Sequence, residues 1–181
     1  MDALTLPLPN QILLLSAPHA AAQLMLELAA RLALSGELHV LDGGNRFNVY
    51  PVARTIRRYT SELTAALARI HLTRAFTCYQ AAAMLADLPT DTRPLLALDF
   101  LATFYDESVR LEESRRLLAD CIPHLQRLST AAPVVVSARP PAAPFPERLP
   151  LIETLRDAAA GTWQLEPLPA PRTLSLWEEE A

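Results

Sequence analysis

Residues 11–23 read Gln-Ile-Leu-Leu-Leu-Ser-Ala-Pro-His-Ala-Ala-Ala-Gln and place a strand, a turn and the start of a helix in succession. The apolar run at 11–15 is short enough for a buried strand, and the Ser-Ala-Pro sequence ends it. The helix predicted over 20–34 carries one narrow polar stripe, formed by Gln23, Glu27 and Arg31. Most of its circumference must therefore be covered by protein.

The same alternation continues along the chain. Apolar runs predict further strands at 38–41, 70–73, 95–101 and 133–138, and apolar spacings of three and four predict helices at 52–70, 77–88 and 107–128. Strands that alternate with helices indicate a parallel sheet covered on both faces, because parallel neighbours need crossover connections. The predicted fold class is α/β.

The domain organisation follows from length and from proline content. A chain of 181 residues fits one domain, with an α/β core over 1–138. Residues 139–150 contain five prolines and are predicted to be a linker or an extended arm without regular structure. Residues 151–181 are expected to complete the domain with a short helix at 151–160 and an edge hairpin formed by 162–166 and 173–177.

The composition is that of an ordinary globular protein, with 51% hydrophobic residues and a net charge of −4. This charge provides no bulk attraction to nucleic acid. Cys78 and Cys121 are too few and too isolated for a disulfide framework or a zinc site, so we expect core thiols, no metal and a cytoplasmic location. The apolar segment at 20–34 is too short to cross a membrane.

The turn at 16–23 stands where a phosphate-binding loop would be, and it differs from one at each key position. Such a loop reads G-x-x-x-x-G-K-[ST]. Here Ser16 and Ala21 replace the glycines, Ala22 replaces the lysine and Gln23 the hydroxyl; all 16 basic residues of the chain are arginine. Two interpretations stay open: an anion at the helix N-terminus with His19 as a donor, or a plain strand-to-helix turn.

Two further segments are predicted to lie at the carboxyl edge of the sheet, where open α/β folds bind ligands. Asp42-Gly43-Gly44-Asn45-Arg46 holds two of the four glycines, which predicts unusual backbone dihedrals. The alternative is a tight loop with an Asp42 cap and Arg46 in a structural ion pair. Asp99 ends another strand and is predicted either to bind a metal or to accept hydrogen bonds from loop N–H groups or hydroxyls.

An arginine patch is the third candidate. Arg54, Arg57 and Arg58 lie off the apolar stripe of the predicted 52–70 helix, and Arg69 and Arg74 are expected nearby. Arginines that contact phosphates would give salt-dependent DNA binding. The alternative is a solvated helix face paired with Glu62.

Over roughly residues 10–140 the chain resembles the RecA/RadA recombinase family of P-loop ATPases. The resemblance lies in Leu-Asp-Gly-Gly-Asn-Arg-Phe at 41–47, Thr-Arg-Ala-Phe-Thr at 73–77 with Gln80, Leu-Leu-Ala-Leu-Asp at 95–99 and Val-Val-Val-Ser at 134–137. It implies a RecA-like three-layer fold. It also implies a degenerate nucleotide site: the glutamate that orients water corresponds to Gly44, and the pair that senses the γ-phosphate to Ala138-Arg139. Of the catalytic positions only Asp99 matches.

These observations predict a non-hydrolysing RecA-like paralogue that acts as an interaction or regulatory module, without a cofactor, and assembles with itself or with a protein partner in DNA recombination or repair. A DNA-binding module that uses the arginine patch and the proline-rich arm is the second hypothesis. A phosphohydrolase with a remodelled loop, using His19, Asp42, Arg46 and Asp99, is the third. The resemblance predicts a vestigial nucleotide site formed by Ser16, Pro18, His19, Gln23, Asp42, Gly43, Gly44, Arg46 and Asp99.

Overall fold

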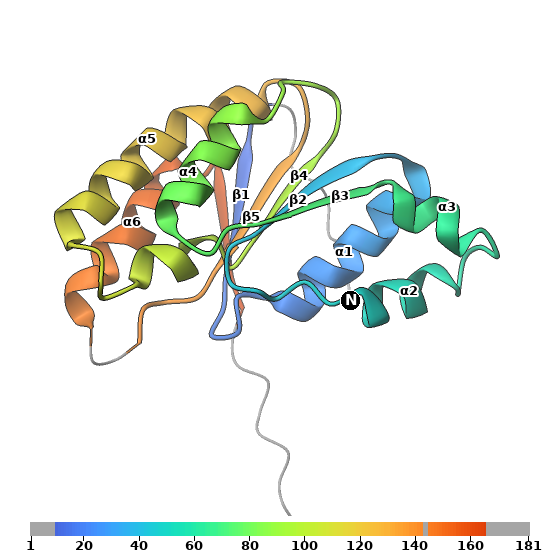
Figure 1. The fold of residues 1–181 in the computed structure, drawn as a ribbon, viewed down its shortest axis with the longest axis horizontal. Helices are drawn as coiled ribbons and strands as arrows, with labels where there is room; N and C mark the ends of the chain where they lie inside the picture. The colour runs from blue at the N-terminus through green and yellow to red at the C-terminus, as the bar shows by residue number, and fades with distance from the viewer. Residues whose placement is uncertain (1–9, 143–144, 166–181) are drawn as a thin grey trace, which may run out of the picture.

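A computed structural model describes residues 10–142 and 145–165 (Figure 1). In this part of the chain six parallel strands form one sheet in the order β3-β2-β4-β5-β1-β6. The strands are β1 (Ile12–Ser16), β2 (Leu38–Asp42), β3 (Ile70–Arg74), β4 (Leu95–Leu98), β5 (Val134–Ala138) and β6 (Gly161–Gln164). The predicted α/β class is confirmed.

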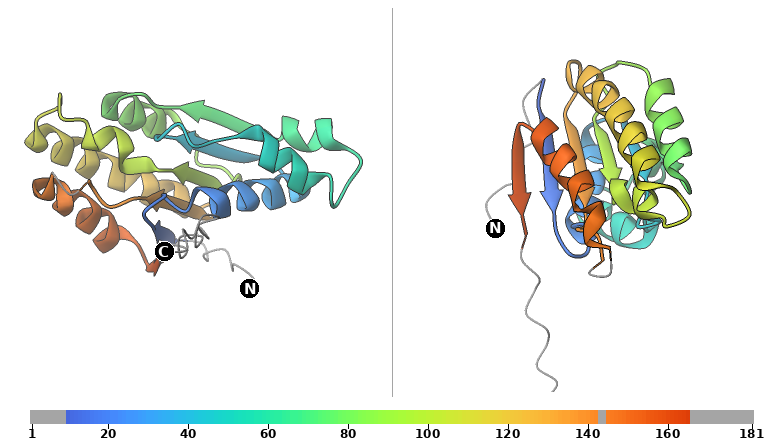
Figure 2. Two further views of the ribbon diagram at one scale, coloured as in Figure 1. Left: turned by 90° about the horizontal axis from the view of Figure 1, so that it is seen from below. Right: turned by 90° about the vertical axis from the view of Figure 1, so that its left-hand side faces the viewer.

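The helices form two layers, one on each face of the sheet (Figure 2). They are α1 (Ala22–Ser35), α2 (Val49–Ile56), α3 (Leu63–Ala68), α4 (Cys78–Asp87), α5 (Leu111–Ser129) and α6 (Leu149–Ala158), with 3₁₀ turns η1 (Phe100–Tyr105) and η2 (Pro146–Arg148). Side chains alternate along β1: Leu13 and Leu15 pack with α1, and Ile12 and Leu14 with α5 and α6. This three-layer α/β arrangement is consistent with a RecA-like fold.

The helix predicted over 52–70 is wrong in extent. The chain forms α2 and α3 there, separated by a turn at 57–62, and the last predicted residue, Ile70, begins β3. The hydroxyl of Thr60 accepts a hydrogen bond from the Glu62 N–H at 3.1 Å, which offers the backbone an alternative to continuing the helix. The apolar spacing continues across the break, so periodicity alone did not reveal it.

Two further boundaries also differ from the prediction. The strand expected over 95–101 ends at Leu98, because Asp99 adopts a left-handed conformation (φ 44°) and η1 follows. The helix expected from residue 107 begins at Leu111, because Asp106 instead forms a turn in which its carboxylate accepts from the N–H and the hydroxyl of Ser108.

The proline-rich segment 139–150 is more regular than predicted. It contains η2 and the start of α6, and Pro150 lies in the first turn of α6, where its missing N–H costs no helical hydrogen bond. Arg148 is buried and donates hydrogen bonds to the carbonyl oxygens of Phe104 at 2.6 Å and Val109 at 2.8 Å. The segment is therefore anchored to η1 and to the loop before α5.

The edge hairpin is not confirmed. Its first half corresponds to β6, which pairs in parallel with β1 and so forms an edge of the sheet. Its second half, 173–177, lies outside the described residues. Cys78 and Cys121 are buried thiols as expected, and burial raises the pKa of Cys121 to about 12. No described helix combines the length and the apolar character needed to span a membrane.

Candidate functional site

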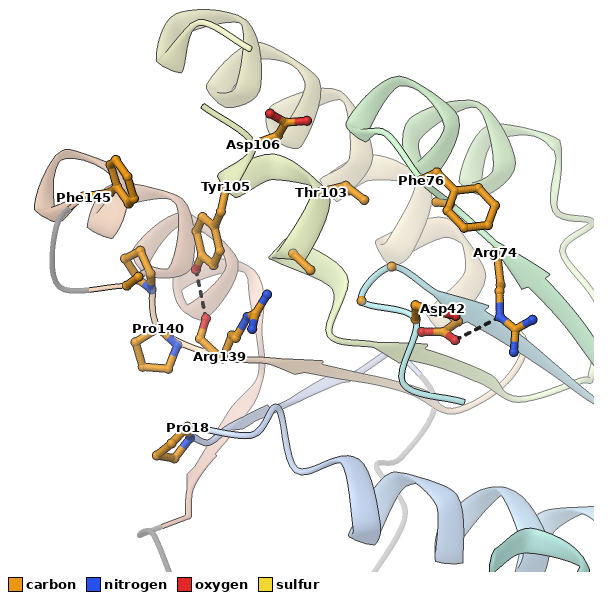
Figure 3. A pocket seen from close by; sticks show the side chains of 17 residues that line it. Pro18, Asp42, Arg74, Phe76, Thr103, Tyr105, Asp106, Arg139, Pro140 and Phe145 are labelled. Carbon is orange, nitrogen blue, oxygen red and sulfur yellow. Dashed lines mark hydrogen bonds and ion pairs between the residues drawn. The ribbon is translucent and has the colours of Figure 1, made fainter. Parts of the chain in front are cut away.

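The carboxyl ends of β2, β4 and β5 lie side by side because these strands are neighbours in the sheet. The loops that follow them line an open cavity of about 720 Å³ (Figure 3). The β2 loop contributes Gly43 and Gly44, η1 contributes Thr103 and Tyr105, and the segment after β5 contributes Arg139. Strand order alone therefore brings together residues that are far apart in the sequence.

Asp42, the last residue of β2, is fully buried and organises its own loop. Its Oδ1 accepts from the Arg46 N–H at 2.8 Å, and its Oδ2 accepts from the Phe47 N–H at 2.9 Å. The Nε of Arg74, from the neighbouring strand β3, lies 3.4 Å from Oδ2. Asp42 therefore caps its own loop, as expected if residues 42–46 form a tight structural loop.

The glycines of this loop are needed for a reason other than the predicted one. Neither Gly43 nor Gly44 has a positive φ; that conformation is adopted by Asn45, at 53°. A Cβ on Gly44 would instead lie 2.4 Å from Oδ2 and 2.5 Å from Cβ of Asp99. The loop therefore contains an unusual backbone dihedral, as predicted, but at Asn45 and not at a glycine; Gly44 is explained by its close approach to Asp99.

Asp99 is fully buried and its partners differ from those predicted. Its Oδ2 lies 3.2 Å from Arg46 Nε and 3.5 Å from Arg139 Nε, so two guanidinium groups take the place of loop N–H groups or hydroxyls. Its own backbone N–H donates to the Ser137 hydroxyl at 3.0 Å. Among the described residues Oδ1 has no hydrogen-bond partner, and no group of three metal-ligating side chains occurs.

Two backbone amides of the turn at 16–23 are bonded within the turn. The Ala20 N–H donates to the Ala17 carbonyl at 2.9 Å, and the Ala22 N–H to the His19 carbonyl at 3.1 Å, so these two donors do not face a ligand. Ala20 and Ala21 adopt the left-handed conformation, with φ of 50° and 49°. The backbone thus makes a turn that suits glycine, and alanine bears the steric cost.

Replacing Ala20 or Ala21 by glycine is expected to change the stability of the protein by less than about 1 kcal/mol each. Glycine relieves a left-handed penalty of about 1–2 kcal/mol, and it loses about 0.4–1 kcal/mol through the more flexible unfolded chain and about 0.8 kcal/mol through the buried methyl group. Urea unfolding measures the change. Ala83→Gly, at an exposed helical position of α4, is the matched control and should cost about 1 kcal/mol. Equal losses in all three variants would contradict strain at this turn.

The structure brings together only part of the predicted nucleotide site. Pro18, Asp42, Gly43 and Gly44 line the cavity, and Arg46 and Asp99 form the ion pair beside it. The other three are placed elsewhere: Ser16 is buried between β5 and β6, and His19 and Gln23 are exposed and do not line the cavity.

The arginine patch is smaller than predicted. Arg54, Arg57 and Arg58 are exposed on α2 and the turn after it, and none has an ion pair with another described residue, so the predicted pairing with Glu62 does not occur. Arg69 donates to the carbonyl oxygens at the end of α1, and Arg74 binds Asp42. These last two arginines serve the fold.

The predicted site omits three polar side chains of the cavity, those of Thr103, Tyr105 and Arg139. Of these, only Arg139 has a sequence signal, as half of the pair that matches the γ-phosphate-sensing position. The Tyr105 hydroxyl donates to the Arg139 carbonyl at 3.0 Å, and burial raises the pKa of this tyrosine (Figure 3). The available signal was Arg139 itself, a charged residue directly after a buried strand.

No family model matches this chain, and no curated protein matches it in sequence. The resemblance to RecA-like ATPases therefore rests on the sequence segments given above, together with a fold consistent with it.

Proposed function

We propose that this protein is a non-hydrolysing, degenerate RecA-like paralogue that acts in the cytoplasm as an interaction or regulatory module, in DNA recombination or repair. One observation carries the proposal: Asp99, the only matching catalytic position, is already neutralised by Arg46 and Arg139. A divalent cation at this fully buried carboxylate would be repelled by the two guanidinium groups that already contact its Oδ2. We therefore expect that this site does not bind the magnesium ion that nucleotide hydrolysis would need.

The turn before α1 supports the same proposal. A phosphate-binding loop needs free amides and a lysine, whereas this turn bonds the amides of Ala20 and Ala22 to its own carbonyl groups and the chain has no lysine. A protein that keeps this scaffold without the catalytic residues is proposed to act through contacts on its surface. The partner is proposed to be a second copy of the chain or an active ATPase of the same kind.

The direct test is nucleotide turnover. The purified chain with ATP and Mg²⁺ should release no phosphate above the buffer rate, because the site lacks the lysine and the water-orienting glutamate. Asp99→Asn is the control and should give the same baseline. Hydrolysis that Asp99→Asn abolishes would contradict the proposal and favour the remodelled phosphohydrolase.

Direct DNA binding is the second candidate, and one observation favours it: Arg54, Arg57 and Arg58 are exposed and unpaired within the described residues. Single-stranded DNA should then be retarded in a gel at low salt, and the Arg57→Ala/Arg58→Ala variant should abolish the retardation. If the wild-type chain does not retard DNA at low salt, this candidate is excluded.

A further inference from the structure

The amino ends of β2, β3 and β4 lie at the edge of the sheet opposite the cavity (Figure 1). Residues 88–94 connect α4 to β4 at this edge, and the Pro94 carbonyl accepts a hydrogen bond from the His39 N–H at 2.9 Å. A cluster of ionisable side chains from the start of β2, from β3 and from this loop gathers here; its members are Glu37, His39, His71, Asp91 and Arg93. The cluster is therefore separate from the site described above.

The two histidines of the cluster face each other. His39 and His71 are directly opposite in the pairing of β2 with β3, and their ring centroids are 5.6 Å apart. The Nε2 of His71 lies 3.1 Å from Glu37 Oε2. The Nε2 of His39 is buried, has no hydrogen-bond partner among the described residues and lies 3.9 Å from Asp91 Oδ2. A proton on His71 therefore has a carboxylate beside it, whereas a proton on His39 has to compete for one.

Arg93 is the competitor, and it contacts both carboxylates. Its Nε donates to Asp91 Oδ2 at 2.8 Å, its backbone N–H donates to Asp91 Oδ1 at 2.9 Å, and its Nη1 donates to Glu37 Oε2 at 3.5 Å. With both histidines neutral, the cluster has one cation and two carboxylates. One proton on the histidine pair balances these charges, whereas with a second proton three cations share the two carboxylates, which disfavours that second proton.

His39 is the group that bears this cost. The groups that face it are His71 from β3 and Asp91 and Arg93 from the loop. Arg127 of α5 contacts the same loop, but it donates to a loop hydroxyl and to carbonyl oxygens of α4. Burial lowers the pKa of His39 most, Arg93 lowers it next, and Asp91 offsets this only in part. A second proton therefore binds more readily once the loop has moved away and water reaches His39.

We propose that this cluster is a pH-sensitive latch, which holds the loop 88–94 against β2 and β3 while the histidine pair carries at most one proton and releases the loop when both histidines are protonated. The direction follows from linkage. Because the pKa of His39 is lowered in the closed state, this state is favoured above about pH 6.5, the ordinary pKa of histidine, and loses stability as the pH falls below it. The latch is independent of the proposed function, since it lies at the opposite edge of the sheet from the cavity.

A nuclear magnetic resonance titration of the full chain from about pH 8 to about pH 5 tests the latch. The ring signals of His39 should show that it takes up its proton below the ordinary range of histidine. Over the same interval the amide protons of His39 and Arg93 should lose several-fold of their protection from exchange, after correction for the intrinsic pH dependence of exchange, because their bonds to Pro94 and Asp91 open. Proton uptake by His39 without this loss of protection would overturn the proposal.

Two variants test whether the second proton drives the release. His39→Gln and His71→Gln each leave one histidine in the cluster, so the loop should keep its protection down to about pH 5 in both. His71 is 42% exposed, so its replacement should leave the fold intact. In His71→Gln the pKa of His39 should also rise, because a neighbouring positive charge is gone; a purely structural role for His71 would not produce this shift.

His124→Gln is the matched control, because His124 lies on α5 outside the cluster; this variant should release the loop as the wild type does. Release at low pH that persists in both His39→Gln and His71→Gln would overturn the proposal, as would a wild-type loop that stays protected down to about pH 5 while both histidines are protonated. These measurements use neither nucleotide nor partner, so failure of the latch is distinct from failure of the proposed function.

Discussion

Replacing both Arg46 and Arg139 by methionine is expected to lower the free energy of unfolding by about 3–5 kcal/mol, the cost of leaving a buried charge without its partners. Asp99 is fully buried, and these two guanidinium groups are its cationic partners within the described chain. Each single variant should cost less than half of this, because the remaining arginine still neutralises the carboxylate. Urea unfolding at neutral pH measures the losses.

The rescue variant separates the buried charge from lost packing. Asp99→Asn should recover most of the loss in the double-methionine background, because it removes the charge, and asparagine tolerates the left-handed backbone found at this position. The same substitution in the wild type should be mildly destabilising. If the double variant loses less than about 1 kcal/mol, the two ion pairs do not compensate Asp99.

Gly44→Ala is expected to cost about 2–3 kcal/mol, a large penalty for one added methyl group. The new Cβ would lie 2.5 Å from Cβ of Asp99 and 2.7 Å from its Cγ, so either the short Asp99 side chain or the backbone has to move. Gly36→Ala is the matched control: nothing lies within 4 Å of its Cβ, and its φ of −179° suits any residue. It should be neutral or slightly stabilising.

A second variant shows whether Asp99 is the obstacle. In an Asp99→Gly background the atoms that clash are gone, and glycine accepts the left-handed backbone at 99, so Gly44→Ala should then cost little. A cost that stays the same in both backgrounds would show that Gly44 is required for another reason.

The parts of the fold that the sequence predicts are those set by local composition. Buried parallel strands read as apolar runs, and so β1, β2 and β5 were placed to within about a residue. The capping carboxylate of Asp42 was also predictable, because its bonds are to Arg46 and Phe47, four and five residues away.

The rest depends on contacts between distant residues. Asp99 contacts Arg46, 53 positions away, because β4 lies beside β2 in the sheet. Local sequence patterns do not predict the order of the strands. The role of Gly44 has the same origin, since its neighbour is again Asp99. The parallel pairing of β6 with β1 replaced a predicted hairpin for a similar reason: the residues of 161–164 specify a strand but not its partner.

Calorimetric titration with Mg-ATP tests the central claim most directly. With the lysine absent, the amides of Ala20 and Ala22 bonded within the turn and Asp99 held by two arginines, ATP should show no magnesium-dependent binding. A saturable, magnesium-dependent isotherm with micromolar affinity would contradict it.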